Sequence, residues 1–224
     1  MMAVGPAATA AAGEVPYGEK LLFVAVRNGQ TIGSHKLVFK RQGGQLLVET
    51  SIDLAVKVLG ITAYRYKHRS QEAWSGDDLQ SIATSTDDDG KLYALRATLA
   101  MNGLVVEREM PQSAASVSVS NQRLFTSRPI RETLPSDVFP STHWNVKQTR
   151  QSRLLNSQKG TLERIEVTIV GREMVKVVAG AIEATRYSYS GGINMDQWFD
   201  DRGRWVKSAF AGSDGSTIEY ILQE

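Results

Sequence analysis

His68 and Glu72 are the two side chains of this 224-residue chain whose types and spacing come closest to an acid–base pair. Both fall on one face of a predicted strand, where residues four positions apart lie about 13 Å apart. Because they cannot form a hydrogen bond at that distance, acid–base chemistry would need a carboxylate or hydroxyl brought by folding to about 3 Å from the imidazole. A hydrolase or isomerase built around His68 is therefore the weakest of three hypotheses.

Metal and cofactor chemistry finds little support in the residue types. The chain has no cysteine and only three histidines, His35, His68 and His143, none of them in an H-x-x-H or H-E-x-x-H pattern. Zinc–thiolate sites, iron–sulfur clusters, disulfides and cysteine nucleophiles are therefore excluded. The acidic turn 87–90 lacks the terminal glutamate of a calcium-binding loop, and no G-x-S-x-G elbow, phosphate loop or dinucleotide fingerprint occurs. We expect no catalytic residue, no metal and no cofactor.

A row of aromatic and polar side chains is the strongest functional signal in the sequence. Between positions 64 and 74 the side chains alternate, which predicts a strand with one buried and one exposed face. Near the C-terminus, Tyr187 and Tyr189 are followed by Trp198, a spacing close to that between Tyr66 and Trp74. This faint repeat indicates that each half of the chain contributes an aromatic hairpin to one curved sheet. In the first row, Tyr64, Tyr66, His68, Ser70, Glu72 and Trp74 share one face, opposite Arg65, Lys67, Arg69 and Gln71.

Two interpretations of these aromatic residues remain open. In the first they line a ligand cavity, where the rings bury an apolar chain and the phenol, imidazole and indole groups hold its polar end. In the second they fill the interior of a small barrel, which is the usual arrangement. Ser70 and Glu72 are costly in a dry core and keep the cavity hypothesis open. The candidate ligand-binding residues are Tyr64, Tyr66, His68, Glu72, Trp74, Tyr187, Tyr189 and Trp198.

The elements that must position these residues are strands. Most of the chain has a period of two, interrupted by turn residues, and Asn28-Gly29 and Asn102-Gly103 are typical of tight hairpins. Segment 45–56, for example, alternates between apolar and polar side chains, as a half-buried antiparallel strand does. The fold class is therefore all-β, an antiparallel curved sheet, barrel or half-barrel of about a dozen strands. Strands are predicted at 116–120, 161–170 and 174–178, among other segments.

The strand pattern breaks between Asn121 and Asn145, where three of the six prolines lie. This predicts a long proline-rich loop. Ser141 or Thr142 can cap one short helix over 144–155, although the apolar periodicity of that segment is thin. The loop and the helix would plug or cover the mouth of the curved sheet.

Composition excludes several classes of protein. Hydrophobic residues make up 42% of the chain and charged residues 22%, as in folded globular domains rather than disordered or fibrous chains. A formal net charge of +2 is too balanced for a protein that grips nucleic acid. No apolar run approaches the roughly 18 residues that a transmembrane helix requires. We therefore expect neither a nucleic-acid partner nor a transmembrane segment.

Residues 1–13 are small and apolar, and they contain a run of alanines that resembles a signal-peptide cleavage site. We interpret them as the remnant of a signal peptide, with a disordered alanine-rich tail as the alternative. Residues 14–224 would then form a single β-barrel-like domain. This interpretation places the protein in the periplasm or outside the cell.

Several motifs of turns and aromatic residues carry a family resemblance. They are the Asn28-Gly29 hairpin, the row from Tyr64 to Trp74, and the C-terminal motifs Trp198-Phe199-Asp200 and Gly203-Arg204-Trp205-Val206. With these motifs the chain resembles uncharacterised families of exported bacterial β-proteins that are labelled as domains of unknown function. Those families resemble in turn the open half-barrels of lipoprotein carriers, which implies an apolar groove.

The leading hypothesis is a non-catalytic exported protein that binds a lipid-like or other apolar small molecule in the cavity of its curved sheet. The alternative is a structural or protein-interaction module of the cell envelope, with a filled barrel and an envelope protein as partner. Such a module would use an exposed strand edge or the basic stripe Arg65, Lys67 and Arg69. A cavity of roughly 300 Å³ or more would favour the first hypothesis.

Overall fold

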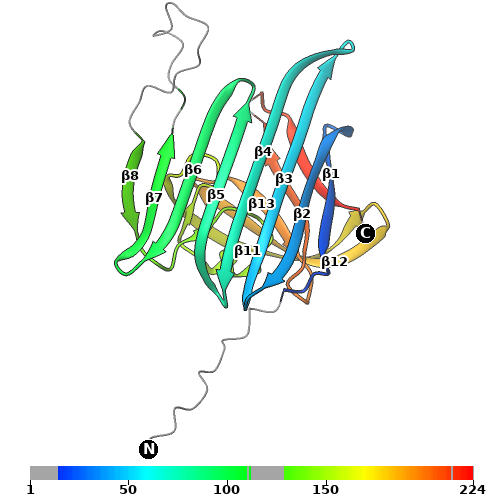
Figure 1. Ribbon diagram of the computed structural model, residues 1–224. Coiled ribbons are helices and arrows are strands. Elements are labelled where there is room, and N and C mark those ends of the chain that lie inside the picture. Colours follow the sequence, from blue (N-terminus) through cyan, green and yellow to red (C-terminus); the bar gives the residue numbers. More distant parts are fainter. Residues whose placement is uncertain (1–14, 110, 112–128, 213, 224) are drawn as a thin grey trace, which may run out of the picture.

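The protein is built on one antiparallel sheet that curves back on itself (Figure 1). The computed structural model describes residues 15–109, 111, 129–212 and 214–223. Within them, fifteen strands form a single sheet in the order β8-β7-β6-β5-β4-β3-β2-β1-β15-β14-β13-β12-β11-β10-β9. The predicted all-β fold is confirmed, and the sheet is curved without closing into a barrel. The predicted signal-peptide remnant lies outside the described residues.

The first half of the sheet is a meander in which β1 to β8 pair in chain order. The predicted hairpin at Asn28-Gly29 is confirmed, since these residues have φ angles of 48° and 82°. Two consecutive positive φ angles are what a two-residue turn of type I′ requires. The strands of this half are β1 (Lys20–Arg27), β2 (Gln30–Gln42), β3 (Gln45–Val58), β4 (Ile61–Ser75), β5 (Asp78–Asp88), β6 (Lys91–Ala100), β7 (Gly103–Glu109) and β8 (Ile130–Leu134).

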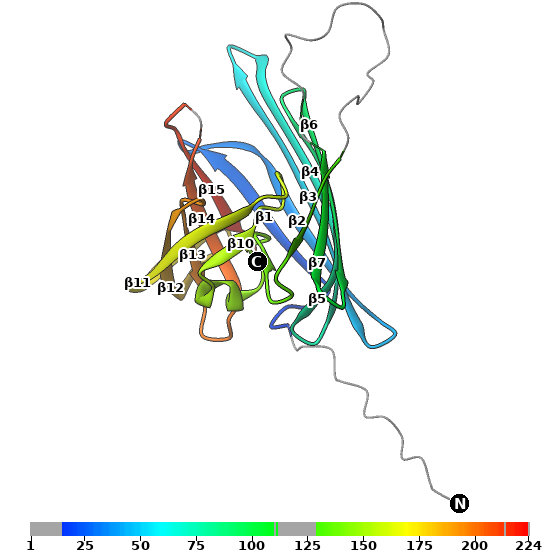
Figure 2. The ribbon, with the colours of Figure 1, turned by 90° about the vertical axis from the view of Figure 1, so that its left-hand side faces the viewer.

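The second half of the sheet faces the first across the interior (Figure 2). Antiparallel pairing of β1 with β15, in which Phe23 is opposite Leu222, joins the two halves into one sheet. The pair β9–β10 is parallel, unlike the other pairs of described strands. The strands of this half are β9 (Phe139–Pro140), β10 (Arg153–Leu155), β11 (Leu162–Val177), β12 (Gly180–Gly191), β13 (Met195–Phe199), β14 (Trp205–Ala211) and β15 (Thr217–Leu222).

The alternation predicted for the aromatic row is confirmed in β4. From His68 to Trp74 the even-numbered side chains are buried, whereas Arg69 and Gln71 between them are exposed. In the register with β3, His68 lies opposite Ile52 and Tyr66 lies opposite Leu54. The buried faces of the two strands therefore coincide and form the concave wall of the sheet.

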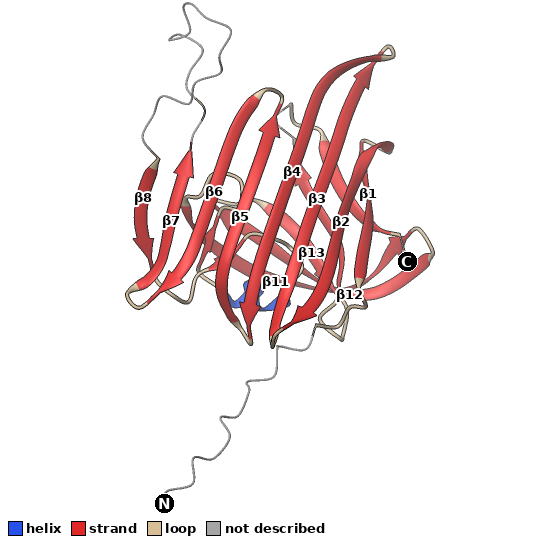
Figure 3. Cartoon of the chain, in the orientation of Figure 1, coloured by secondary structure: helices blue, strands red, loops and turns tan. Residues whose placement is uncertain are grey.

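The helix predicted over 144–155 is shorter and differently capped. It is the 3-10 helix η2 (Val146–Arg150), and the side chain of Asn145, rather than Ser141 or Thr142, accepts from the backbone N–H of Lys147 at 3.0 Å. The predicted segment then continues into β10, where both leucines are completely buried. The thin periodicity thus reflects residues that pair with a sheet edge instead of presenting an amphipathic helical face. Figure 3 shows this short helix in blue among the strands.

Two further boundaries differ from the sequence prediction. The proline-rich segment predicted as a loop contains β8 and β9. The strands predicted at 161–170 and 174–178 form one strand, β11, whose register shifts between Ile169 and Gly171. Gly171 has a φ of 150° and supplies a bulge instead of a turn. The predicted strand at 116–120 lies outside the described residues.

One end of the half-barrel is closed by packed aromatic rings. We call this end the base and define it by Phe39, Trp74, Phe139 and Trp144. The Trp144 ring packs edge-on against two other rings, with centroid distances of 5.5 Å to Trp74 and 5.7 Å to Phe39. Trp74 is 1% exposed, so this end is a filled core. The base therefore supports the interior above it.

None of the described helices is long and apolar enough to cross a membrane.

Candidate ligand-binding cavity

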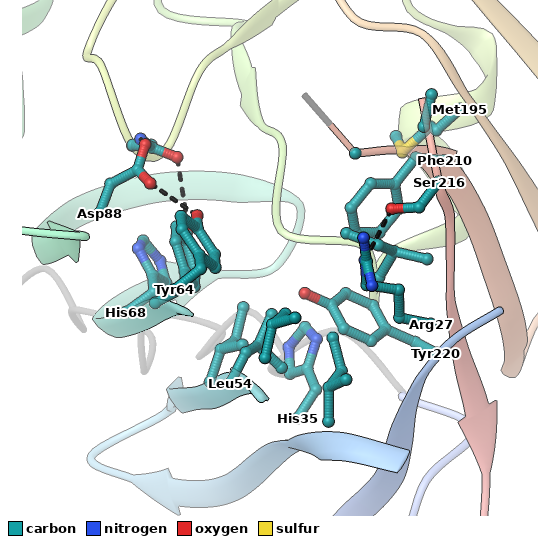
Figure 4. Close-up of a pocket in the computed structure, with 18 of the residues that line it drawn as sticks. Arg27, His35, Leu54, Tyr64, His68, Asp88, Met195, Phe210, Ser216 and Tyr220 are labelled. Carbon is teal, nitrogen blue, oxygen red and sulfur yellow. Dashed lines mark hydrogen bonds between the residues drawn. The ribbon is translucent and has the colours of Figure 1, made fainter. Parts of the chain in front are cut away.

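A cavity of about 820 Å³ lies between the two halves of the sheet (Figure 4). One wall comes from β2, β3 and β4, and the other from β13, β14 and β15. The lining extends to the strand ends and turns that carry Arg27, Asp88, Asp89, Lys91 and Asp214, which we call the mouth. Most of the wall between mouth and base is apolar and includes Ile32, Ile52, Leu54, Val56, Met195, Phe210 and Ile218.

Three of the predicted ligand-binding residues, Tyr64, Tyr66 and His68, line this cavity from β4. The Tyr64 hydroxyl donates to Asp88 at 2.6 Å, and the Tyr66 hydroxyl donates to Gln158 at 3.2 Å. Burial, followed by the neighbouring Asp88 carboxylate, raises the pKa of both phenols above the ordinary tyrosine value. Both phenols are therefore neutral hydrogen-bonding groups on the cavity wall.

Glu72 and Trp74, also predicted to bind ligand, lie outside the cavity lining and belong to the packing at the base. Glu72 Oε2 accepts from the indole N–H groups of Trp74 at 2.8 Å and Trp144 at 3.1 Å. Glu72 Oε1 is buried without a partner among the described residues. Burial raises the pKa of Glu72 to about 7. For these two residues the filled-core interpretation fits the structure.

Tyr187 and Tyr189 also lie outside the cavity lining. Tyr189 is buried in a small cluster with Leu154, Ile165 and Met195. Tyr187 packs edge-on against Phe199, with the two ring centroids 6.0 Å apart. The second tyrosine pair therefore fills the space behind one cavity wall and leaves the wall itself to other residues.

Trp198 also lies outside the cavity lining and is buried in the core. Its ring lies beside the cationic groups of Arg186 at 5.3 Å and Lys207 at 5.1 Å, and its indole N–H donates to Glu173. Because adjacent side chains of a strand point to opposite faces, Trp198 lies opposite Gln197. Of the faint aromatic repeat, only the tyrosines of the first copy therefore line the cavity.

The acid–base hypothesis for His68 required a hydroxyl or carboxylate within about 3 Å. Thr86 Oγ1 lies 2.8 Å from His68 Nδ1 and meets that requirement. Burial lowers the pKa of His68 to about 4, however, so the imidazole is a weak base at neutral pH. Among the described side chains, no carboxylate is hydrogen-bonded to His68 or Thr86, so the pair lacks the third group that orients a catalytic histidine.

The residues that sequence reasoning missed lie at the deep end of the cavity. We call this end the floor and define it by the predicted residue His68 and by His35, His143 and Tyr220, which were not predicted to bind ligand; all four belong to the lining. His35 could have been found, since it shares the buried face of β2 with Leu37 and Phe39. His143 carried no such signal, because it lies in an irregular segment whose position is set only by tertiary packing.

A chain of buried polar groups positions His143 at the floor. His143 Nδ1 lies 2.7 Å from Gln197 Nε2, which is 3.5 Å from the Ser208 hydroxyl. The Trp205 indole N–H donates to Ser208 at 2.9 Å. His143 itself has a φ of 69°, a conformation uncommon for residues other than glycine. The contacts of its side chain therefore hold the backbone of His143 in a strained conformation.

Within the part of the chain that the structure describes, neither the basic stripe nor a metal centre adds a further candidate site. Arg65, Lys67 and Arg69 of the basic stripe are exposed on the convex face of β4, and Arg69 forms a bidentate ion pair with Asp53 at 2.9 and 2.8 Å. Within the described ranges, no group of three or more histidine and carboxylate side chains has the arrangement of a metal site. The main functional proposal therefore rests on the cavity.

Fold and cavity together define an open antiparallel β half-barrel with a hollow interior above a packed base. The chain belongs to the family described as Domain of unknown function (DUF6134), whose family model matches residues 23–223. The match runs from β1 to the end of the last strand, so it covers the whole cavity. The predicted resemblance to a family of this kind is confirmed. No curated protein and no solved structure matches the chain.

Proposed function

We propose that this protein is a non-catalytic exported protein that binds a lipid-like or other apolar small molecule inside the half-barrel. The cavity of about 820 Å³ carries this proposal. Its volume falls within the range of about 300–1,000 Å³ that is usual for small-molecule sites, whereas a barrel that served only as a scaffold would be filled by its own side chains.

The chemistry of the walls supports an elongated ligand with a large apolar part. Leu54 and Val56 from one half and Ile218 from the other offer hydrocarbon surface between mouth and floor. Each Å² of apolar ligand surface that leaves water contributes about 25 cal/mol to binding. Neutral polar groups at both ends of this wall, such as Tyr64 and His35, would orient the bound molecule.

Fluorescence of N-phenyl-1-naphthylamine, which rises in apolar sites, tests this proposal. We expect the wild-type chain to bind the probe and Val56→Trp, which fills the cavity, to reduce its affinity at least tenfold. Ala55→Trp places the same ring on the opposite face of β3 and serves as the matched control. Native mass spectrometry of protein purified from its own host, followed by organic extraction, would then identify a natural ligand. Equal probe affinity for both tryptophan variants would contradict the proposal.

A second candidate, an envelope interaction module, is favoured by the edge of β11. This strand pairs with β10 only at residues 162–164, so its outer edge beyond them has no strand partner within the described chain. Ile169, Val170 and Met174 are exposed there by 67%, 54% and 66%. Exposed apolar edges of this kind pair with further strands. Loss of a crosslinked envelope partner in Ile169→Lys, with Thr168→Lys retaining it in part, would support this candidate.

A further inference from the structure

The charges of the cavity lining are distributed unevenly. Five charged side chains belong to the lining, and all lie at the mouth, where strands end or turn: Arg27, Asp88, Asp89, Lys91 and Asp214. The floor contains imidazole and phenol groups instead. A ligand that enters the cavity therefore leaves the charged rim behind and meets neutral hydrogen-bonding groups at the deep end.

His35 is the group at the floor that most needs a partner. It is 1% exposed, and neither of its ring nitrogens has a hydrogen-bond partner among the described residues. A neutral imidazole carries one N–H donor and one acceptor nitrogen. Buried polar groups in native proteins are nearly always paired, so two unpaired nitrogens beside a cavity point to a partner supplied from that cavity.

Phe23, Trp205, His143 and Tyr220 pack against the His35 ring, and of these four only His143 and Tyr220 also line the cavity. The His35 ring centroid lies 4.8 Å from that of Tyr220 and 5.8 Å from that of His143, and both contacts are edge-on. His143 Nδ1 is already occupied by the Gln197 side chain, which leaves its other ring nitrogen for a ligand. His35, His143 and Tyr220 thus bring their hydrogen-bonding groups to the same end of the cavity.

We infer that the floor recognises an uncharged hydroxyl group, so that the ligand is a neutral long-chain amphiphile bound with its polar end at His35 and His143. This inference rests on the proposed function and names the ligand class. A hydroxyl both donates and accepts, which matches the mixed hydrogen-bonding capacity of two neutral imidazoles. The apolar chain would then lie along Leu54, Val56 and Ile218 toward the mouth.

The same floor disfavours charged headgroups. Burial lowers the pKa of His143 to about 4 and that of His35 well below its ordinary value, so neither ring offers a positive charge to an anion at neutral pH. No carboxylate belongs to the floor to pair with a cationic headgroup. Burial of an unpaired charge is far costlier than burial of a hydroxyl that forms hydrogen bonds.

Competition among three probes of equal chain length tests the inference at pH 7.5. Decan-1-ol, decanoate and decyltrimethylammonium would each be titrated against bound N-phenyl-1-naphthylamine. We expect decan-1-ol to displace the probe at a concentration at least tenfold lower than either ion. In His35→Phe the ratio between the displacing concentrations of the ions and of decan-1-ol should fall at least tenfold, whereas Gln71→Phe, on the convex face of β4, should retain the wild-type ratio.

The outcomes separate this inference from the proposed function. If the naphthylamine probe and all three amphiphiles fail to bind, the proposed function fails and this inference with it. If they bind but decanoate or the ammonium probe competes as well as the alcohol, the inference alone is overturned. If a folded His35→Phe still prefers decan-1-ol over the ions as strongly as the wild type does, the inference is also overturned. That result would mean that His35 of the wild type bonds to an ordered water and not to the ligand. Should that variant not fold, the ranking of the probes on the wild-type chain decides.

Discussion

Trp144 donates its indole N–H to Glu72 at 3.1 Å, although the two residues are 72 positions apart in the chain. The bond ties the irregular segment at the base to the open end of the longest hairpin of the first half, where Glu72 lies opposite Val48. Trp74 donates to the same carboxyl oxygen at 2.8 Å. The base of the half-barrel is therefore organised around one buried acidic group, and the stability of the fold should depend on its protonation.

Glu72 should make the protein less stable at alkaline pH. Burial raises its pKa from 4.5 to about 7, so the folded chain binds this proton more tightly than the unfolded chain does. The contribution to the free energy of unfolding is present below pH 4.5 and is lost as the pH rises through 7. We expect the free energy of unfolding of Glu72→Gln to exceed that of the wild type by up to about 3 kcal/mol at pH 8.5 and to match it near pH 4.

Urea unfolding at the two pH values measures this difference. Glu49→Gln, at an exposed position of β3 beside Lys40, is the control and should change stability little at either pH. A Glu72→Gln variant that is less stable than the wild type at pH 8.5 would show that the ionised carboxylate stabilises the base.

His68 should have the opposite effect at acid pH. Burial lowers its pKa from 6.5 to about 4, so the unfolded chain binds the proton more readily. Stability is therefore lost as the pH falls from 6.5 toward 4, by about 1.4 kcal/mol per pH unit for one histidine. His68→Gln keeps a hydrogen-bonding group beside Thr86. We expect this variant to reduce the slope of unfolding free energy against pH by the amount that one titrating histidine contributes, about 1.4 kcal/mol per pH unit. Urea midpoints measured at half-unit intervals of pH give the slope, and parallel curves for variant and wild type would refute the prediction.

Gly103 should be intolerant of a side chain because its backbone lies against β8. It has a φ of 129°, and a Cβ at this position would lie 2.2 Å from the carbonyl oxygen of Leu134. Gly90 has a φ of 87° with nothing near its Cβ position, so Gly90→Ala isolates the cost of the backbone conformation alone. We expect Gly103→Ala to cost at least about 2 kcal/mol and Gly90→Ala about 1 kcal/mol. Thermal unfolding followed by circular dichroism compares them, and equal losses would argue against the clash.

Met195 and Trp198 lie three positions apart on β13, yet only Met195 lines the cavity. Met195→Trp should therefore reduce the affinity for N-phenyl-1-naphthylamine at least fivefold, because the larger ring occupies ligand volume. Trp198→Phe should leave the affinity within about twofold, since its partners are Arg186, Lys207 and Glu173. Equilibrium titration of both variants checks this, and a loss of affinity confined to Trp198→Phe would reassign the cavity wall.

The sequence by itself determined the strands and the faces of those strands. Alternation in segments such as 45–56 and 64–74 predicts which side chains are buried, because successive residues of a strand point to opposite faces whatever the surroundings. Turn residues such as Asn28-Gly29 predict the hairpins for an equally local reason, their tolerance of positive φ angles. The all-β class and the burial of His68, Ser70 and Glu72 follow from these local rules.

Only the tertiary structure decided which buried faces meet across the interior and where space is left between them. Glu72 and His68 share one face of β4, but the base covers Glu72 whereas the cavity borders the buried His68, because a segment more than 70 positions away packs at one level of the strand. Trp198 was assigned to the cavity on a repeat, yet its strand pairing places it opposite Arg186, and it is buried in the core on the other face of β13 from Gln197. Contacts between distant segments depend on the curvature of the whole sheet, and no local pattern of residues encodes that curvature.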